Sequence, residues 1–112
     1  MPLISDSLAR EHLRIDDADE PISIYTRAAE LWAAEYLDRN IYEDQTALDA
    51  AVADGTAGSD PIVINDLIRM GILLLLGHLY ANREEVVVGE TMVQVPMGVT
   101  RLLHPYRKGL GV

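Results

Sequence analysis

The sequence contains no cysteine, no phenylalanine and a single tryptophan, Trp32. Without cysteine there are no disulfides, thiolate metal ligands or cysteine nucleophiles, and a reducing compartment suits the chain. Hydrophobic residues still make up 49% of the sequence, which is enough to build a core. That core must consist mainly of Ala, Leu, Ile and Val, which favours closely packed helices. At 112 residues, we expect residues 1–112 to form one domain.

The chain also lacks a long hydrophobic run. The best candidate, between Arg69 and Arg83, holds 13 residues and includes His78. A membrane-spanning helix needs about 20 apolar residues. The first ten residues have no basic start ahead of an apolar stretch, so they do not resemble a signal peptide. We therefore expect a soluble protein with no membrane partner.

Basic residues are few, and the charge is unevenly distributed. Residues 1–60 carry 14 acidic and 4 basic side chains, whereas residues 61–112 carry 4 acidic and 5 basic ones. Autonomous DNA binding needs a basic face that neutralises phosphates, and this composition argues against one. An acidic body with a mildly basic C-terminal end is compatible with docking of that end on an acidic protein surface.

Apolar spacing predicts an all-α fold, a small helical bundle around one long central apolar helix. The expected helices cover residues 5–15, 21–40, 44–55, 61–84 and 98–105. Pro21 and Pro61 are each expected in the first turn of their helix. The helix that follows Pro61 is apolar almost all round, which indicates neighbours on several sides. Gly71 and Gly77 in this helix suggest close approach of a neighbouring backbone.

Between the last two helices we expect an extended loop or β-hairpin arm at about 86–97, before the short C-terminal helix and a tail at 105–112. Two β-prone runs flank Gly89, and the sequence shows no other strand. An isolated hairpin is marginal in water and its edges invite pairing. The arm therefore either folds over its own core or pairs with a neighbouring subunit, and the residues alone leave both open. The candidate interface residues are Val86, Val87, Val88, Met92, Val93, Val95 and Met97.

No catalytic or metal-binding pattern stands out. The three histidines His12, His78 and His104 lack the spacing of a helix-borne zinc site, and His78 is expected to be a core residue. Phosphate-binding loops and nucleophile elbows are absent from the sequence. The acidic run is Asp16, Asp17, Asp19 and Glu20. It does not fit a calcium-binding loop, because Pro21 occupies a ligand position and the turn glycine is missing. Helix capping explains these carboxylates better. We expect no enzyme, no cofactor and no metal.

Four segments resemble the head–tail connector family of long-tailed bacteriophages, also described as head-completion or DNA-packaging proteins. The segments occur in the same order as in the family, and together they span most of the chain apart from about residues 41–60. The segments are EHLRIDDADE, AAELWAAEYLDR, MGILLLLGHLYANREEVVVG and VPMGVTRLLHPYR.

The resemblance implies a structural, non-enzymatic virion protein that assembles in the host cytoplasm as a homo-oligomeric ring, a dodecamer, on the portal vertex. Such a ring extends the DNA channel without specific DNA binding and receives a stopper or tail-completion protein. By position, the loop at 86–97 would contact neighbouring subunits. The portal-binding tail would comprise Tyr106, Arg107, Lys108, Leu110 and Val112. The acidic run 16–20 is a candidate for the channel wall, where negative charge lets DNA slide rather than stick.

Two other functions are compatible with the residues. One is a small helical homodimeric regulatory or binding module that associates through its long helix and the valine arm. The other, much weaker, is a metal-dependent hydrolase that uses the carboxylates of residues 16–20.

Overall fold

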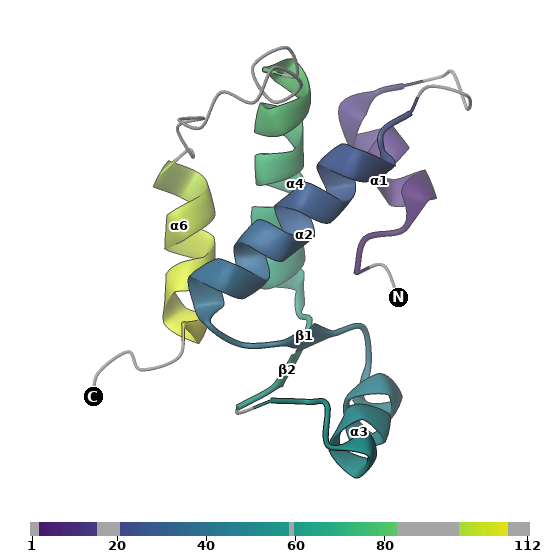
Figure 1. The fold of residues 1–112 in the computed structure, drawn as a ribbon. Helices are drawn as coiled ribbons and strands as arrows, with labels where there is room; N and C mark the ends of the chain where they lie inside the picture. The colour runs from purple at the N-terminus through teal and green to yellow at the C-terminus, as the bar shows by residue number, and fades with distance from the viewer. Residues whose placement is uncertain (1–2, 16–20, 59, 83–96, 108–112) are drawn as a thin grey trace.

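In the computed structural model the chain forms a small helical bundle with one short excursion (Figure 1). The structure describes residues 3–15, 21–58, 60–82 and 97–107. In chain order its elements are α1 (Asp6–Leu13), α2 (Ser23–Leu37), β1 (Ile41–Tyr42), α3 (Gln45–Asp54), β2 (Ile62–Val63), α4 (Asp66–Ala81), α6 (Met97–Leu103) and the 3₁₀ turn η1 (His104–Tyr106). The expectation of a predominantly helical fold is confirmed.

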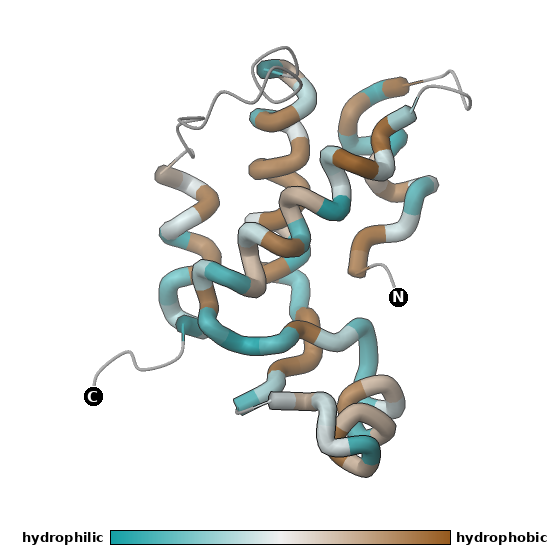
Figure 2. The backbone as a smooth tube through the Cα atoms, viewed as in Figure 1, coloured by the Kyte–Doolittle hydropathy of each residue, from teal (hydrophilic) through white to brown (hydrophobic). Residues whose placement is uncertain are grey.

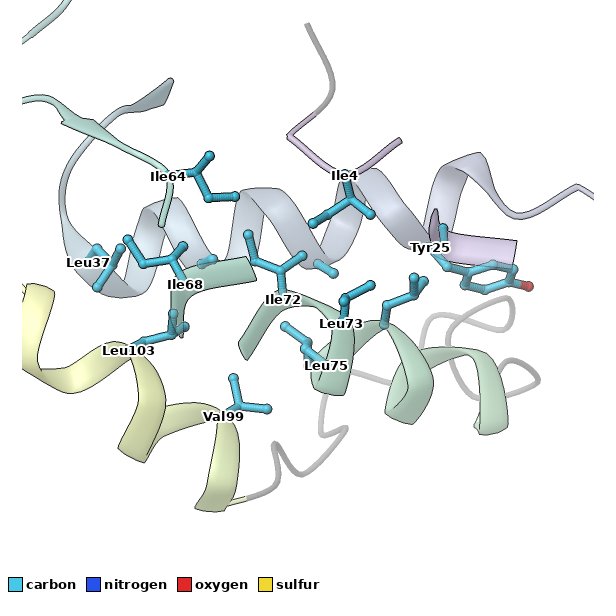
Figure 3. Packing of buried hydrophobic residues seen from close by; sticks show 14 of the residues in the cluster. Ile4, Tyr25, Leu37, Ile64, Ile68, Ile72, Leu73, Leu75, Val99 and Leu103 are labelled. Carbon is cyan, nitrogen blue, oxygen red and sulfur yellow. The ribbon is translucent and has the colours of Figure 1, made fainter. Parts of the chain in front are cut away.

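Helix α4 lies at the centre and packs against α1, α2 and α6. Its Ile68, Ile72 and Leu76 are fully buried, and Figure 3 shows the side chains of Ile68 and Ile72 in the space that α4 shares with α2 and α6. Figure 2 shows that hydrophobic residues run along most of this helix. Since apolar burial is the main stabilising term in folding, α4 organises the core.

Helix α2 crosses in front of α4 and contributes a stripe of small and aromatic side chains. Ala29, Ala33 and Leu37 are fully buried, with Tyr25 one turn before them. Alanine lets two helix backbones approach closely. The ring of Tyr25 meets that of Tyr80 edge-on, with centroids 5.9 Å apart, and this contact joins the start of α2 to the end of α4.

Helix α6 packs closely against α4 at Gly71. A Cβ atom built on Gly71 would lie 3.0 Å from Leu103 Cδ2, so tight that Leu103 would have to move by a few tenths of an ångström. The glycine therefore permits the contact, but its partner is a side chain and not the backbone that the sequence suggested. Val99 and Leu103 are fully buried in the same core (Figure 3).

The N-terminal segment is held on α2 by a single carboxylate. Glu30 Oε2 accepts hydrogen bonds from the backbone N–H groups of Leu3 and Ile4, each at 2.8 Å. Ile4 then enters the core. The next helix, α1, begins at Ser5, whose hydroxyl oxygen accepts from the Leu8 N–H as an N-cap.

A short β–α–β excursion, β1–α3–β2, separates α2 from α4. Strands β1 and β2 are parallel, pairing Ile41 with Ile62 and Tyr42 with Val63. Helix α3 connects them and lies away from the other helices (Figure 1). It is capped by Asp44 and ends at Gly55, as the sequence predicted. The expectation that no strand occurs outside the valine arm is wrong.

Two helix starts differ from the sequence prediction. Pro61 precedes β2, and α4 begins five residues later at Asp66, after the N-cap Asn65, whose side-chain oxygen accepts from the Ile68 N–H at 2.9 Å. Pro21 likewise lies before the N-cap residue Ile22 of α2. At its other end α2 stops at Leu37, because Asp38 adopts a left-handed conformation with φ of 55°.

Candidate assembly surfaces

The segment after α6 is clamped to the C-terminal half of α2. The Tyr36 hydroxyl lies 3.2 Å from His104 Nδ1, and the Arg107 guanidinium sits over the Tyr36 ring, 5.2 Å from its centroid. On the same helix the Trp32 ring stacks on that of Tyr36, with centroids 5.2 Å apart and planes within 7° of parallel. We call Trp32, Tyr36, His104 and Arg107 the C-terminal anchor.

Arg39 extends this clamp to the excursion. Its Nη1 donates to the Tyr106 carbonyl oxygen at 3.0 Å, and its Nε donates to the Asp60 carbonyl oxygen at 2.8 Å. Arg39 also forms an ion pair with the Asp60 carboxylate, with Nη2 and Oδ1 3.4 Å apart. One guanidinium thus joins the end of α2, the loop before β2 and the last turn of the described chain.

The outer side of α2 carries exposed apolar residues among charges. Ile24 and Leu31 are two turns apart on the side opposite the buried Ala29 and Ala33, and Leu31 is 67% exposed. The α2 face is defined as Ile24, Arg27, Leu31, Glu35 and Asp38, all exposed. A soluble helix normally buries such apolar side chains or keeps this side polar.

The α2 face borders an open cleft. This cleft, of about 460 Å³, lies between α2 and β1 and is lined by Leu3, Arg27, Glu30, Leu31, Ala34, Asn40, Ile41 and Tyr42. A smaller hollow toward the C-terminal end of α2 is lined by Leu31 together with Glu35, Asp38 and Arg39. The α2 side of the molecule is therefore concave and partly apolar.

Helix α4 has neighbours on several sides, as its sequence suggested, but one side of it is left uncovered. Leu67, Met70 and Leu74 are exposed on the side opposite the buried Ile72 and Leu76. A Cβ atom built on Gly98 would lie 3.7 Å from Leu74 Cδ1, so Leu74 is next to the start of α6. The exposed apolar stripe of α4 therefore continues onto α6. The α4–α6 face is defined as Leu67, Met70, Leu74, Met97 and Arg101, all exposed.

Of the predicted subunit-interface residues, only Met97 lies within the described part of the chain. Instead of ending a loop it is the first residue of α6, and it is 66% exposed. Val86, Val87, Val88, Met92, Val93 and Val95 lie outside the described residues. Of the predicted portal-binding tail, Tyr106 and Arg107 are described: the Tyr106 carbonyl oxygen accepts from Arg39, just beyond α2, and Arg107 lies over the ring of Tyr36 in α2. Lys108, Leu110 and Val112 lie outside the described residues.

The acidic candidates Asp16, Asp17, Asp19 and Glu20 also lie outside the described residues. Within the described ranges no cluster of His, Asp and Glu side chains is arranged to hold a metal ion. The exposed acids among the described residues include Asp44, Asp49 and Asp54 on and beside α3. The excursion, residues 41–63, holds five acidic side chains and no basic one, so it is the acidic end of this structure.

The histidines do not come together. His12 is exposed on α1, and His104 bonds to Tyr36 in the C-terminal anchor. His78 is half-buried near the end of α4, and its carbonyl oxygen accepts from the Asn82 side chain at 2.8 Å. Within the part of the chain that the structure describes, no helix is long and apolar enough to cross a bilayer.

The C-terminal anchor and the Arg39 contacts were not predicted from the sequence. Trp32 and Tyr36 are four residues apart, a spacing that places two rings on one side of a helix, and this signal was visible. Their partners His104 and Arg107 lie 68 and 71 positions after Tyr36, and no local pattern connects them. The exposed stripe of α4 was hidden because leucine and methionine occupy its buried and exposed sides alike.

The chain shows no significant match to a curated protein or to a solved structure. A family model described as phage gp6-like head–tail connector protein matches residues 7–107, which include every helix from α2 onward, both strands and most of α1. That family consists of structural phage proteins and is not an enzyme family. Because the match covers nearly the whole sequence, the chain belongs to the phage gp6-like head–tail connector proteins.

Proposed function

We propose that this connector forms a homo-oligomeric ring on the portal vertex of the phage head, extends the DNA channel and receives a stopper or tail-completion protein. The observation that carries the proposal is the family match over residues 7–107. A dodecameric ring follows the resemblance noted in the sequence. The protein would then act by position and shape, without catalysis.

The tail at residues 106–112 is the proposed portal-binding segment. Its first residues are held against α2 by Arg39 and by the ring of Tyr36. A clamped base fixes where the tail leaves the body, which lowers the entropy lost when it docks. Arg107 and Lys108 give it positive charge for an acidic site on the portal.

The loop at 86–97 is the proposed contact between neighbouring subunits. The end of α4 and the start of α6, which lie before and after this loop in the chain, are near the same end of the α4–α6 pair, whereas the end of α6 lies toward the other end (Figure 1). The loop and the tail therefore start from different ends of the molecule. This separation lets one serve a neighbouring copy while the other serves the portal.

The acidic half of the chain is proposed to face the DNA. Residues 16–20 and the excursion at 41–63 together hold nine of the 18 acidic residues and no basic one. A negative wall repels the phosphate backbone, so DNA can pass without being held. The uneven charge of the sequence supports this orientation, and the exposed carboxylates of Asp44, Asp49 and Asp54 are available for it.

The proposal is tested with DNA-filled heads that carry the portal but lack this protein. Purified wild-type chain should bind such heads and restore tail attachment in vitro. Val87→Asp should remain folded but fail to assemble, because a charge is costly in a desolvated contact. A chain that ends at Pro105 should fail to bind the heads.

A matched control is Val52→Asp, which places the same charge on an exposed residue of α3. It should bind the heads as the wild type does. Two results would count against the proposal: heads that never bind the wild-type chain, or Val87→Asp and the truncated chain restoring tails at the wild-type level. If Val87→Asp unfolds the monomer, the loop belongs to its own core and not to the subunit contact.

A further inference from the structure

The two exposed apolar faces of this molecule point in opposite directions. Helices α2 and α4 pack on each other through Ala29, Ala33 and Leu37 on one side and Ile68, Ile72 and Leu76 on the other. Ile24 and Leu31 lie on the far side of α2, and Leu67, Met70 and Leu74 lie on the far side of α4. The chain therefore exposes apolar surface on both outer sides of its central helix pair.

The charges at the edges of the two faces are complementary. On the α2 face, Glu35 and Asp38 follow Leu31 toward the C-terminal end of the helix. On the α4–α6 face, Arg101 lies one turn after Met97 on the outer side of α6. Among the described residues none pairs with the side chain of Glu35, Asp38 or Arg101, so all three are available to a partner.

The shapes of the two faces also differ. The α2 face borders the cleft of about 460 Å³ between α2 and β1. The α4–α6 face presents leucine and methionine side chains along two adjacent helices. Methionine is unbranched and adapts to irregular hollows. A concave side and a side of protruding apolar residues can fit each other, whereas neither fits a copy of itself as well.

We propose that the α2 face of one copy receives the α4–α6 face of the next copy, with Arg101 placed opposite Glu35 and Asp38. The inference rests on the proposed function, since it assigns the surfaces along which neighbouring subunits of the ring meet. Two different patches on opposite sides of a subunit produce head-to-tail contacts, which form a ring when the rotation between neighbouring copies closes. A twofold dimer would need a single patch that is complementary to itself.

The contact is expected to be weak between free subunits. Each face holds only a few exposed apolar side chains, whereas stable interfaces bury about 800 Å² per partner. Copies held side by side on a portal meet at high effective concentration, which strengthens a weak contact. The test therefore uses assembled particles and not dilute protein.

The absence of native cysteine makes disulfide trapping a clean test. Double variants combine Leu31→Cys with one of Leu67→Cys, Met70→Cys or Leu74→Cys, which together sample two turns of α4. Cysteines bridge only when their Cα atoms lie within about 7 Å, so the three registers are tried separately. The variants are introduced into the phage, particles are purified and mildly oxidised, and the chain is detected on non-reducing gels.

At least one double variant should give a ladder of covalent oligomers that extends beyond the dimer. Each single-cysteine variant should remain monomeric, because its cysteine has no counterpart in the neighbouring copy. The control Val52→Cys with Met70→Cys places the first thiol on α3, away from the α2 face, and should give no ladder.

Three results would overturn the inference. Dimers from Leu31→Cys alone would mean that the α2 face meets itself. If particles contain the chain but give no ladder in any register, these faces are not the contact between subunits, and the proposed connector function still stands. Complete, infectious particles that lack the chain would remove the proposed function as well.

A charge exchange provides an independent test of the same contact. Arg101→Glu should reduce incorporation of the chain into particles, and so should Glu35→Arg with Asp38→Arg. Combining all three changes should restore incorporation, because the opposite charges would face each other again. Additive loss in the combined variant would contradict the pairing.

Discussion

The guanidinium of Arg39 is hydrogen-bonded to the carbonyl oxygen of Tyr106, 3.0 Å away and 67 positions later in the chain. The same side chain holds the carbonyl oxygen of Asp60 at 2.8 Å. Arg39 stands two residues beyond α2, so the end of that helix is fixed to the excursion and to the base of the C-terminal tail. Loss of the Arg39 side chain should weaken the attachment of α2 to the excursion and to the base of the C-terminal tail.

Arg39→Gln should lower the free energy of unfolding by about 1–3 kcal/mol, because charged hydrogen bonds to partly buried carbonyl oxygens are lost. Urea denaturation followed by circular dichroism measures the change. The matched control is Arg27→Gln, an exposed arginine on α2, which should change stability by less than about 0.5 kcal/mol. Equal stability of the two variants would show that the Arg39 contacts contribute little.

The two glycines of α4 should respond in opposite ways to a methyl group. Gly71→Ala gains helix propensity, but its Cβ would lie 3.0 Å from Cδ2 of the fully buried Leu103. Gly77→Ala meets only His12 Nε2 at 3.6 Å, an ordinary contact. Overpacking costs about 1–3 kcal/mol, whereas the propensity gain is about 1 kcal/mol.

We therefore expect Gly71→Ala to be less stable than Gly77→Ala by about 1–3 kcal/mol, with Gly77→Ala at or above the wild type. Thermal and urea unfolding of both variants check this. A Gly71→Ala variant as stable as Gly77→Ala would mean that α6 shifts away from α4 without loss.

Adjacent leucines of α4 should separate folding from assembly. Leu75 is 1% exposed, and Leu75→Ala should cost about 2–5 kcal/mol of stability through a cavity in the core. Leu74 is 39% exposed, and Leu74→Ala should cost less than about 1 kcal/mol. If the α4–α6 face binds a neighbouring copy, Leu74→Ala should instead reduce incorporation into particles. Equal destabilisation by the two changes would contradict the assignment of the outer side of α4.

The single tryptophan reports on the C-terminal anchor. Tyr36→Phe keeps the ring that stacks on Trp32 and should leave the tryptophan emission unchanged, while it removes the hydroxyl that meets His104. Tyr36→Leu removes the ring and should shift the Trp32 emission, at a stability loss of about 0.5–1.5 kcal/mol for the aromatic pair. Fluorescence of the folded variants measures both. Identical spectra for Tyr36→Leu and the wild type would mean that the stack does not persist in solution.

Features that depend on residues close together in the chain, such as helix caps, were well predicted from the sequence. Asp44 and Gly55 bound α3 as expected, because capping depends on residues within a few positions of each other. Helix α2 was recognisable from its apolar spacing, although its end at Leu37 depends on the backbone conformation of Asp38. The predicted start of α4 was wrong because Pro61 is tolerated before a strand as well as in a first helical turn.

Non-local features were missed. Strands β1 and β2 have two residues each, and each strand exists because the other lies beside it. Such short runs carry no periodicity. Arg39 is one of several surface arginines in the sequence, and only folding brings Asp60 and Tyr106 to it. Similarly, the repeated leucines of α4 do not reveal which side is covered until its neighbours are placed.

The most direct test of the connector function is deletion of this protein's gene from the phage that encodes it, followed by electron microscopy of the lysate. We expect separate free tails and tailless heads that lose their DNA, and complementation with the wild-type gene should restore whole particles. Normal, infectious particles from the deletion would contradict a role at the head–tail joint.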